Sequence, residues 1–152
     1  MAGSPTESIG FSGKGGSLTI STDGTVFTKI SQIKSIKPGG SKANFDDITN
    51  IDSPDAFIER IPTTLDSGTL SFTCVSDPSD AGQTMLLAAF VAQTKLTVKL
   101  QYPKVGTQTT GLLKTFSAYV SNCPMPSVDA TAASTFDAEM TITGPVTDTP
   151  GS

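Results

Sequence analysis

The sequence of 152 residues contains no histidine and no tryptophan, and tyrosine occurs only twice. Histidine is the side chain that most often serves as a general base or a metal ligand near neutral pH. Pockets for small molecules, sugars included, are commonly lined by aromatic side chains. These absences argue against an enzyme and against a carbohydrate-binding site, and we expect no catalytic residue, no metal and no cofactor.

Cysteine and charge are also scarce. The two cysteines, Cys74 and Cys123, do not amount to a disulfide framework, and we expect two reduced, partly buried thiols. Charged residues make up 16% of the chain and the formal net charge is −4. Tight binding to DNA phosphates requires clustered lysine and arginine, so this balance disfavours a DNA-reading protein.

Long apolar runs are absent as well. The sequence has no stretch of about 18 successive apolar residues, and its first residues lack the basic start and apolar core of a signal peptide. We therefore expect no membrane span and synthesis in the cytoplasm.

The sequence is rich in turn residues and in alternating apolar residues, which is typical of a mainly β protein. A hairpin is expected from residue 17 around Asp23-Gly24, followed by a bulged strand that carries Ile30, Ile33 and Ile36. Further strands are indicated at 67–75, 94–102, 114–120 and 134–143. We expect one domain at 17–147, between a Gly/Ser-rich arm at 1–16 and a polar tail at 148–152.

A single helix is indicated at 78–92. Asp77 precedes Pro78, which is favoured at the first helical position, and Asp80 follows three residues after Asp77. The next residues, 81–91, are rich in alanine, leucine and methionine.

The segment 38–66 has few apolar residues and reads as a long acidic loop. Within it six acidic residues stand against Lys42 and Arg60, so its net charge of 2 − 6 = −4 equals that of the whole chain. The acidic residues are Asp46, Asp47, Asp52, Asp55, Glu59 and Asp66. Loops of this length in a compact domain are often functional, which favours an interface here.

Three local patterns allow a chemical interpretation, and in each case a plain one is favoured. The run from Gly13 to Gly16 precedes a strand rather than a helix, so it does not form a phosphate loop. Asp137 and Glu139 share one strand face as paired carboxylates can, but a solvated strand face is favoured, because sugar-binding clefts need aromatic side chains and the chain has few. Cys74 has no histidine to activate it and packs on an apolar face.

The order of elements resembles the tail tube proteins of long-tailed phages, including relatives of the lambda major tail protein. The resemblance rests on "LDSGTLSFTCVSDPSDAGQTMLLAAFVAQTKLTVKL" and "KTFSAYVSNCPMPSVDATAASTFDAEMTITGPVT", and it extends over about 17–147. It implies a β-sandwich or partial barrel with one flanking helix. It also implies that six copies close a ring, and that rings stack through the long loop and the termini.

The resemblance also implies a place and partners for the chain. It would belong to the virion tail, be made in the host cytoplasm, and meet the tape measure, tail tip and tail terminator proteins. DNA would pass through the tube without specific binding. The acidic side chains of 38–66, with Arg60, would contact the next ring, where the basic stretch of Lys29, Lys34 and Lys37 offers a counter-surface. Asp137 and Glu139 are candidates for the wall of the channel.

Two alternatives stay open at this point. Sequence hardly separates a phage tube from the tube of a contractile tail, a secretion system or a gene-transfer particle. An immunoglobulin-like binding module would also fit turn-rich strands, although it should show a signal peptide or an aromatic platform.

Overall fold

The computed structural model describes residues 14–54 and 57–151, which form nine strands and one helix. The elements follow in the order β1 (Ser17–Ser21), β2 (Thr28–Lys29), β3 (Ile33–Pro38), β4 (Lys42–Asp47), β5 (Arg60–Asp66), β6 (Thr69–Val75), α1 (Ala81–Ala92), β7 (Leu96–Gln101), β8 (Leu113–Asn122) and β9 (Thr135–Thr149). The expectation of a mainly β protein with one helix is confirmed.

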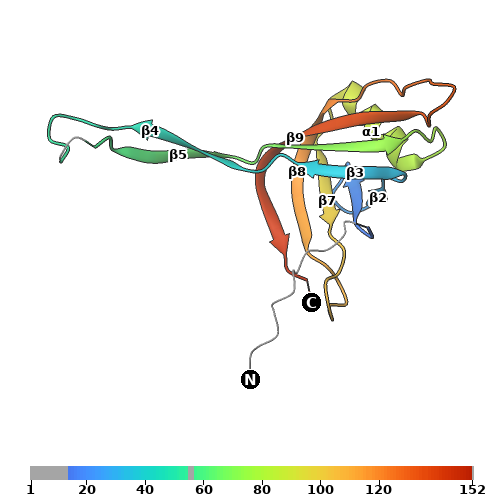
Figure 1. The fold of residues 1–152 in the computed structure, drawn as a ribbon, viewed down its shortest axis with the longest axis horizontal. Helices are drawn as coiled ribbons and strands as arrows, with labels where there is room; N and C mark the ends of the chain where they lie inside the picture. The colour runs from blue at the N-terminus through green and yellow to red at the C-terminus, as the bar shows by residue number, and fades with distance from the viewer. Residues whose placement is uncertain (1–13, 55–56, 152) are drawn as a thin grey trace.

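Seven strands form one antiparallel sheet in the order β2-β1-β7-β8-β9-β6-β3. Neighbouring strands lie about 4.8 Å apart, so the two edges of a flat sheet of this width would be about 29 Å apart. The edge strands β2 and β3 are joined only by residues 30–32, and the four steps from Lys29 to Ile33 span at most about 14 Å. The sheet therefore has to curl, which gives the partial barrel of Figure 1.

The curled sheet encloses one core on its concave face. Side chains that alternate along β6, β7 and β9 are buried there, and Leu86 and Ala89 of α1 join them. The strand residues of the core are Leu18, Ile20, Leu70, Phe72, Cys74, Leu96, Val98, Leu100, Phe116, Ala118, Val120, Phe136, Ala138 and Met140. The period of two in the sequence therefore predicted the buried face of these strands correctly.

The start of α1 holds the short connector that joins the two sheet edges. Gln83 is buried, and its Nε2 donates to the carbonyl oxygens of Ser31 (3.1 Å) and Val75 (3.0 Å). Its Oε1 accepts the N–H of Asp77 at 2.9 Å. All three hydrogen-bonding groups of this amide are thus satisfied, and the connector is fixed to the helix and to β6.

Asp80 serves both the helix and the connector. One carboxylate oxygen accepts the N–H of Gln83 at 3.0 Å, as an N-cap does, and also the N–H of Ser31 at 3.2 Å. Desolvation acts to raise the pKa of Asp80, but the N–H donors of Gln83 and Ser31 favour the charged form, and the net pKa is lowered.

The helix begins three residues later than the sequence indicated. The expected start at Pro78 is wrong because Asp80, and not Asp77, is the N-cap residue. Asp77 belongs to a preceding turn, in which its carbonyl oxygen accepts the N–H of Asp80 and its carboxylate accepts both the N–H and the hydroxyl of Ser79. Asp77 and Asp80 can both cap a helix N-terminus with a side-chain oxygen, so the sequence contains two equally good signals for the start of the helix.

The end of the domain also differs from the expectation. The boundary at 147 and the polar tail at 148–152 are wrong, since β9 continues past Gly144 to Thr149 and pairs again with β8. Gly144 adopts a φ of 78°, and the register shifts there, so Pro145 does not have to donate to the ladder. Lys114 Nζ then meets Asp148 Oδ1 at 2.9 Å.

The segment expected to be a loop at 38–66 contains a two-stranded sheet instead. β4 and β5 pair with each other and with no other strand of the described chain. None of their residues is buried. Because neither face packs on a core, the sequence of these strands lacks the regular alternation of apolar and polar residues that marks a half-buried strand. The bulged strand expected to carry Ile30, Ile33 and Ile36 is present over Ile33–Pro38, where the register of β3 with β6 shifts between Ile33 and Ser35, whereas Ile30 precedes the strand.

Gly82 offers a direct test of the contact between α1 and the connector. A Cβ at this position would lie 2.3 Å from the carbonyl oxygen of Lys29 and 2.7 Å from the Cα of Ile30. We expect Gly82→Ala to lower the free energy of unfolding by about 1–3 kcal/mol, because backbone atoms must move to accept it. Urea unfolding would measure this, with Val91→Ala on the exposed helix face as the control within about 0.5 kcal/mol. A stable Gly82→Ala would show that the connector is loosely held.

Candidate assembly surfaces

The β4–β5 pair forms a ribbon that projects far from the body of the subunit (Figure 1). Large apolar side chains along it and around its tip have no cover within the described chain. They are Phe45, Ile48, Ile51, Phe57, Ile58, Ile61 and Leu65, with exposed fractions from 41% for Ile48 to 97% for Ile51. An apolar surface of this kind on a protruding element indicates contact with another molecule.

The ribbon has one apolar face, which its register defines. Residues directly opposite each other in an antiparallel pair project from the same face. Ala43 lies opposite Leu65, and Phe45 lies opposite Pro62, after a bulge that keeps these four on one side. We call Ala43, Phe45, Pro62 and Leu65 the apolar face of the ribbon.

The opposite face of the ribbon is mostly polar, with Ile61 as the one large apolar side chain of β4 and β5 on it. Asn44 Nδ2 donates to Thr64 Oγ1 at 3.0 Å, and Lys42 lies opposite Asp66. Asp46 lies on this side as well, opposite Ile61. The ribbon is thus amphipathic, and an assembly that covers one face can leave the other in water.

Two of the expected acidic interface residues, Asp47 and Glu59, lie at or near the tip of the ribbon together with Arg60. Asp47 accepts the N–H of Thr49 at 2.9 Å, and hydrogen bonds from Thr49 lower the pKa of the Asp47 carboxyl. Glu59 donates its N–H to Thr49 Oγ1, and Arg60 lies opposite Asp47 in the ladder.

The remaining tip residues form a compact turn. Asp52 donates its N–H to Asn50 Oδ1 at 2.9 Å, and Ser53 donates its N–H to the Asn50 carbonyl oxygen. The sixth candidate, Asp55, lies outside the described residues. The structure therefore carries the described acidic candidates on one exposed ribbon.

The root of the ribbon is a fixed crossing of two glycine-containing segments. A Cβ on Gly68 would lie 2.2 Å from the carbonyl oxygen of Gly40, and the φ of Gly68 is 83°. On the body side, Ile142 donates its N–H to Gly68 O, and Ser67 Oγ donates to Gly144 O at 2.6 Å. These bonds tie the base of the ribbon to β9, so its direction is set by the body of the subunit.

The convex face of the sheet is polar and carries Asp137 and Glu139 of β9. Asp137 is exposed and accepts a hydrogen bond from Thr73 Oγ1 at 2.6 Å. Glu139 lies opposite Ser71 of β6, which in turn lies opposite Lys37 of β3. The structure thus places Lys37 in the same cross-strand row as Glu139, a neighbourhood that the sequence did not indicate.

The three lysines of the expected counter-surface are divided between the two edges of the sheet. Lys29 lies on β2 opposite Thr19, whereas Lys34 and Lys37 lie on β3. The curl of the sheet, described above, is what keeps these edges near each other. Lys29 and Lys99 both lie opposite Thr19 in β1, and Lys99 Nζ stands 4.1 Å from the centre of the Phe27 ring.

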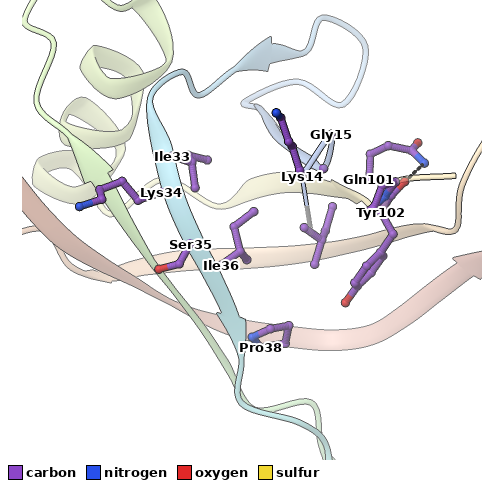
Figure 2. Close-up of a pocket in the computed structure, with 12 residues that line it drawn as sticks. Lys14, Gly15, Ile33, Lys34, Ser35, Ile36, Pro38, Gln101 and Tyr102 are labelled. Carbon is purple, nitrogen blue, oxygen red and sulfur yellow. Dashed lines mark hydrogen bonds between the residues drawn. The ribbon is translucent and has the colours of Figure 1, made fainter. Parts of the chain in front are cut away.

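A cavity of about 650 Å³ lies at the seam where the barrel stays open, between β3 and the end of β7. Ile33 and Ile36 point into it from β3, and Tyr102 lies across from them, while Lys34 projects from the other side of β3 (Figure 2). We call this region the seam.

A second hollow of about 360 Å³ lies between α1 and the loop after β8. Its lining is mostly apolar and includes Leu87, Met125 and Phe136, together with Asp77 and the half-buried Cys123. Burial raises the pKa of the Cys123 thiol, and it raises that of the buried Cys74 to about 12. Neither cysteine is in a disulfide.

Neither a metal site nor a membrane helix is found in the part of the chain that the structure describes. No group of three or more His, Cys, Asp or Glu residues there could hold a metal ion. Among the same residues, no helix combines the length and the apolar character needed to cross a bilayer.

The sequence matches the family described as "Phage tail tube protein, TTP" over residues 2–150. The chain belongs to the phage tail tube protein family. It is therefore a structural subunit of the tube of a virion tail, as the resemblance implied and in preference to a free-standing binding module. No curated protein matches the sequence.

Solved structures of tail assemblies share the fold of this tail tube protein at low sequence identity. A chain of the virion of a native gene transfer agent particle gives a TM-score of 0.70 at 12% identity, over 92% of this chain and 99% of that chain. A chain of the anti-feeding prophage baseplate gives 0.67 at 8% identity, over 98% of both chains. The SPP1 tail tube gives 0.64 at 13% identity, over 90% of this chain and 77% of that chain.

Sequence reasoning missed the apolar face of the ribbon and the seam. A signal for the ribbon was present, because Ala43 and Phe45 alternate with polar residues, and Pro62 and Leu65 fall in the matching segment. For the seam the sequence carried no signal, since β3 and β7 are more than 50 residues apart and meet only because the sheet curls.

The tail tube protein offers a test of the rigid ribbon root at Gly68. We expect Gly68→Ala to change the crossing with Gly40, since the added Cβ overlaps a backbone carbonyl and the positive φ disfavours alanine. The subunit should lose about 1–3 kcal/mol of unfolding free energy and assemble poorly. Gly106→Ala, at a positive φ with no atom within 4 Å of the new Cβ, is the matched control for the φ penalty alone. Equal effects of the two variants would contradict a fixed root.

Proposed function

We propose that six copies of this tail tube protein close into a ring and that the rings stack into a tube through which DNA passes without specific binding. The observation that carries the proposal is the β4–β5 ribbon, whose apolar face is exposed in a subunit that has a complete core without it. The subunit supplies shape and surface, and it catalyses no reaction.

The ribbon is the element that joins one subunit to the next. Burying a phenylalanine or a leucine contributes about 1.5–3 kcal/mol, and a ring repeats each such contact once per subunit. The ribbon is already a hydrogen-bonded pair of strands in the subunit. Docking therefore does not have to order a free loop, and the entropic cost of assembly is lower.

The polar convex face of the sheet is the wall of the channel. This face carries Asp137 and Glu139 among hydroxyl side chains such as Thr73 and Ser71. Lys37 and Lys99 lie on the same face, so it carries charges of both signs and offers no cluster of lysines alone. A wall with carboxylates repels phosphates and one with hydroxyls does not anchor them, so DNA can slide. We propose that these two carboxylates face the lumen.

The ends of the tube require other proteins. A stack of rings has one free ribbon surface at one end and one free receiving surface at the other, because the contact between copies is head-to-tail. We propose that the tail tip and tail terminator proteins cover these ends and that the tape measure protein occupies the lumen during assembly.

Removal of the outer part of the ribbon tests the role of its tip in assembly. We expect a chain without Asp46–Glu59, rejoined through an Asn-Gly turn, to fold with unchanged circular dichroism, because none of the described residues in the deleted segment is buried. Electron microscopy of the concentrated protein should show hollow tubes for the wild type and none for the deletion. Normal tubes from the deletion would overturn the role of the tip.

The apolar face stays in the deletion and is tested by single substitutions. Phe45→Ser should weaken assembly and Asn44→Ser, on the opposite face, should not. Equal assembly of both variants would overturn the role of the apolar face.

Charge reversal on β9 tests the assignment of the lumen. Asp137→Lys with Glu139→Lys changes the formal charge per subunit from −4 to 0 and adds lysines to the proposed wall. We expect variant tubes to retain short duplex DNA at low salt and to release it as salt rises, whereas wild-type tubes retain none. Co-sedimentation of labelled DNA with tubes measures this, and Lys95→Glu serves as a remote charge control. Retention that is identical for wild-type and variant tubes would place the carboxylates elsewhere.

A further inference from the structure

The seam is an incomplete part of the barrel. β3 ends the strand order, so the described chain leaves its outer backbone edge without a ladder partner. An edge strand of this kind is a template for pairing with another strand. The apolar side chains of Ile33 and Ile36 line the cavity beside this edge, together with Leu100 and Tyr102 (Figure 2).

The seam is also basic. Lys14 and Lys34 border the cavity, with the Lys34 side chain on the other side of β3, and a neighbouring cavity of about 610 Å³ adds Lys104. Neither lining contains an aspartate or a glutamate. Lys37 follows on β3 and is exposed.

The ribbon has the complementary properties. It is a two-stranded element with an apolar face, and segment 42–66 has a net charge of 2 − 6 = −4. The hollow beside α1 offers a poorer match, since its one charged lining residue is the acidic Asp77. Opposite charges favour the seam, and like charges disfavour the α1 hollow.

A ribbon cannot reach the seam of its own subunit. It leaves the body at Gly39 and Gly40, directly after β3, and extends away from the barrel (Figure 1). The crossing with Gly68 fixes that direction. A ribbon that fills the seam therefore has to come from a second copy of the chain, and such a head-to-tail contact repeats along a polymer.

We propose that the β4–β5 ribbon of one subunit docks along β3 at the seam of the next, with its apolar face over Ile36 and Tyr102 and its carboxylates near Lys34 and Lys37. This inference rests on the proposed function and names the surface that receives the ribbon. Edge-to-edge pairing with β3 would add main-chain hydrogen bonds to the apolar and charged contacts.

Disulfide trapping distinguishes the seam from the α1 hollow. A chain with Cys123→Ser, a seam cysteine (Ser35→Cys) and a ribbon cysteine (Thr63→Cys or, in a second chain, Ile51→Cys) should form intermolecular disulfides in assembled tubes under mild oxidation. The matched chain keeps native Cys123 in the α1 hollow, carries the same ribbon cysteine and lacks Ser35→Cys. We expect a ladder of covalent oligomers on non-reducing gels from the first chain and monomer from the second. Ladders only from the second chain, or from neither, would overturn the seam.

A charge swap provides a test that does not depend on cysteine placement. Lys34→Glu with Lys37→Glu should raise the critical concentration for assembly about tenfold, and Asp46→Lys with Asp47→Lys should do the same. Mixed in one solution, the two variants should co-assemble alternately near the wild-type concentration, and the charge dependence should fade in high salt. Lys95→Glu, after the helix, is the control. Assembly of both variants at the wild-type concentration would reject the seam, whereas a wild-type chain that forms no tubes would count against the proposed function itself.

Discussion

The three residues between β2 and β3 are the constraint on which the rest of the structure depends. They join the two edges of a seven-stranded sheet, and a link this short is incompatible with a flat sheet. The curl that results turns one face of every strand inward and leaves the other face outward and polar. Gln83 and Asp80 at the start of α1 hydrogen-bond to Ser31 in this link. The helix therefore stabilises the closure of the barrel and is not a separate layer.

The same constraint explains why the subunit has features that only an assembly can use. A link that brings the edges together without pairing them leaves an open seam, and β3 remains an edge strand beside it. The chain then continues from β3 into the ribbon, whose root at Gly40 and Gly68 directs it away from its own barrel. An unpaired edge and an exposed amphipathic ribbon are liabilities in a free subunit. In a closed and stacked polymer, a neighbouring subunit can pair with the edge strand and cover the ribbon, so assembly removes both liabilities.

Charge is distributed in keeping with this arrangement. The net charge of the chain equals that of the segment that contains the ribbon, and the linings of the seam contain lysines only among their charged residues. The convex sheet face is dominated by hydroxyl groups, with Asp137 and Glu139 as its carboxylates on β9. A tube subunit has to bind its own copies firmly and nucleic acid weakly, and a segregation of this kind serves both requirements.

The sequence by itself determined the fold class, the buried faces of the long strands and the single helix, because alternation and turn residues are local and are imposed by burial on one face. The family came from the resemblance of the sequence to known tail tube proteins, which the family match bears out. The sequence-based predictions were wrong for segments whose structure does not depend on the burial of one face. The ribbon was expected to be a loop because its strands have no core face, and β9 was ended at Gly144 because glycine followed by proline usually stops a strand. Tertiary structure alone decided that Lys37 stands in a row with Glu139, that α1 begins after Asp80, and that a seam exists. The first depends on the pairing of β3, β6 and β9, the second on Asp80, which bonds Gln83 and the distant Ser31, and the third on the curl of the sheet.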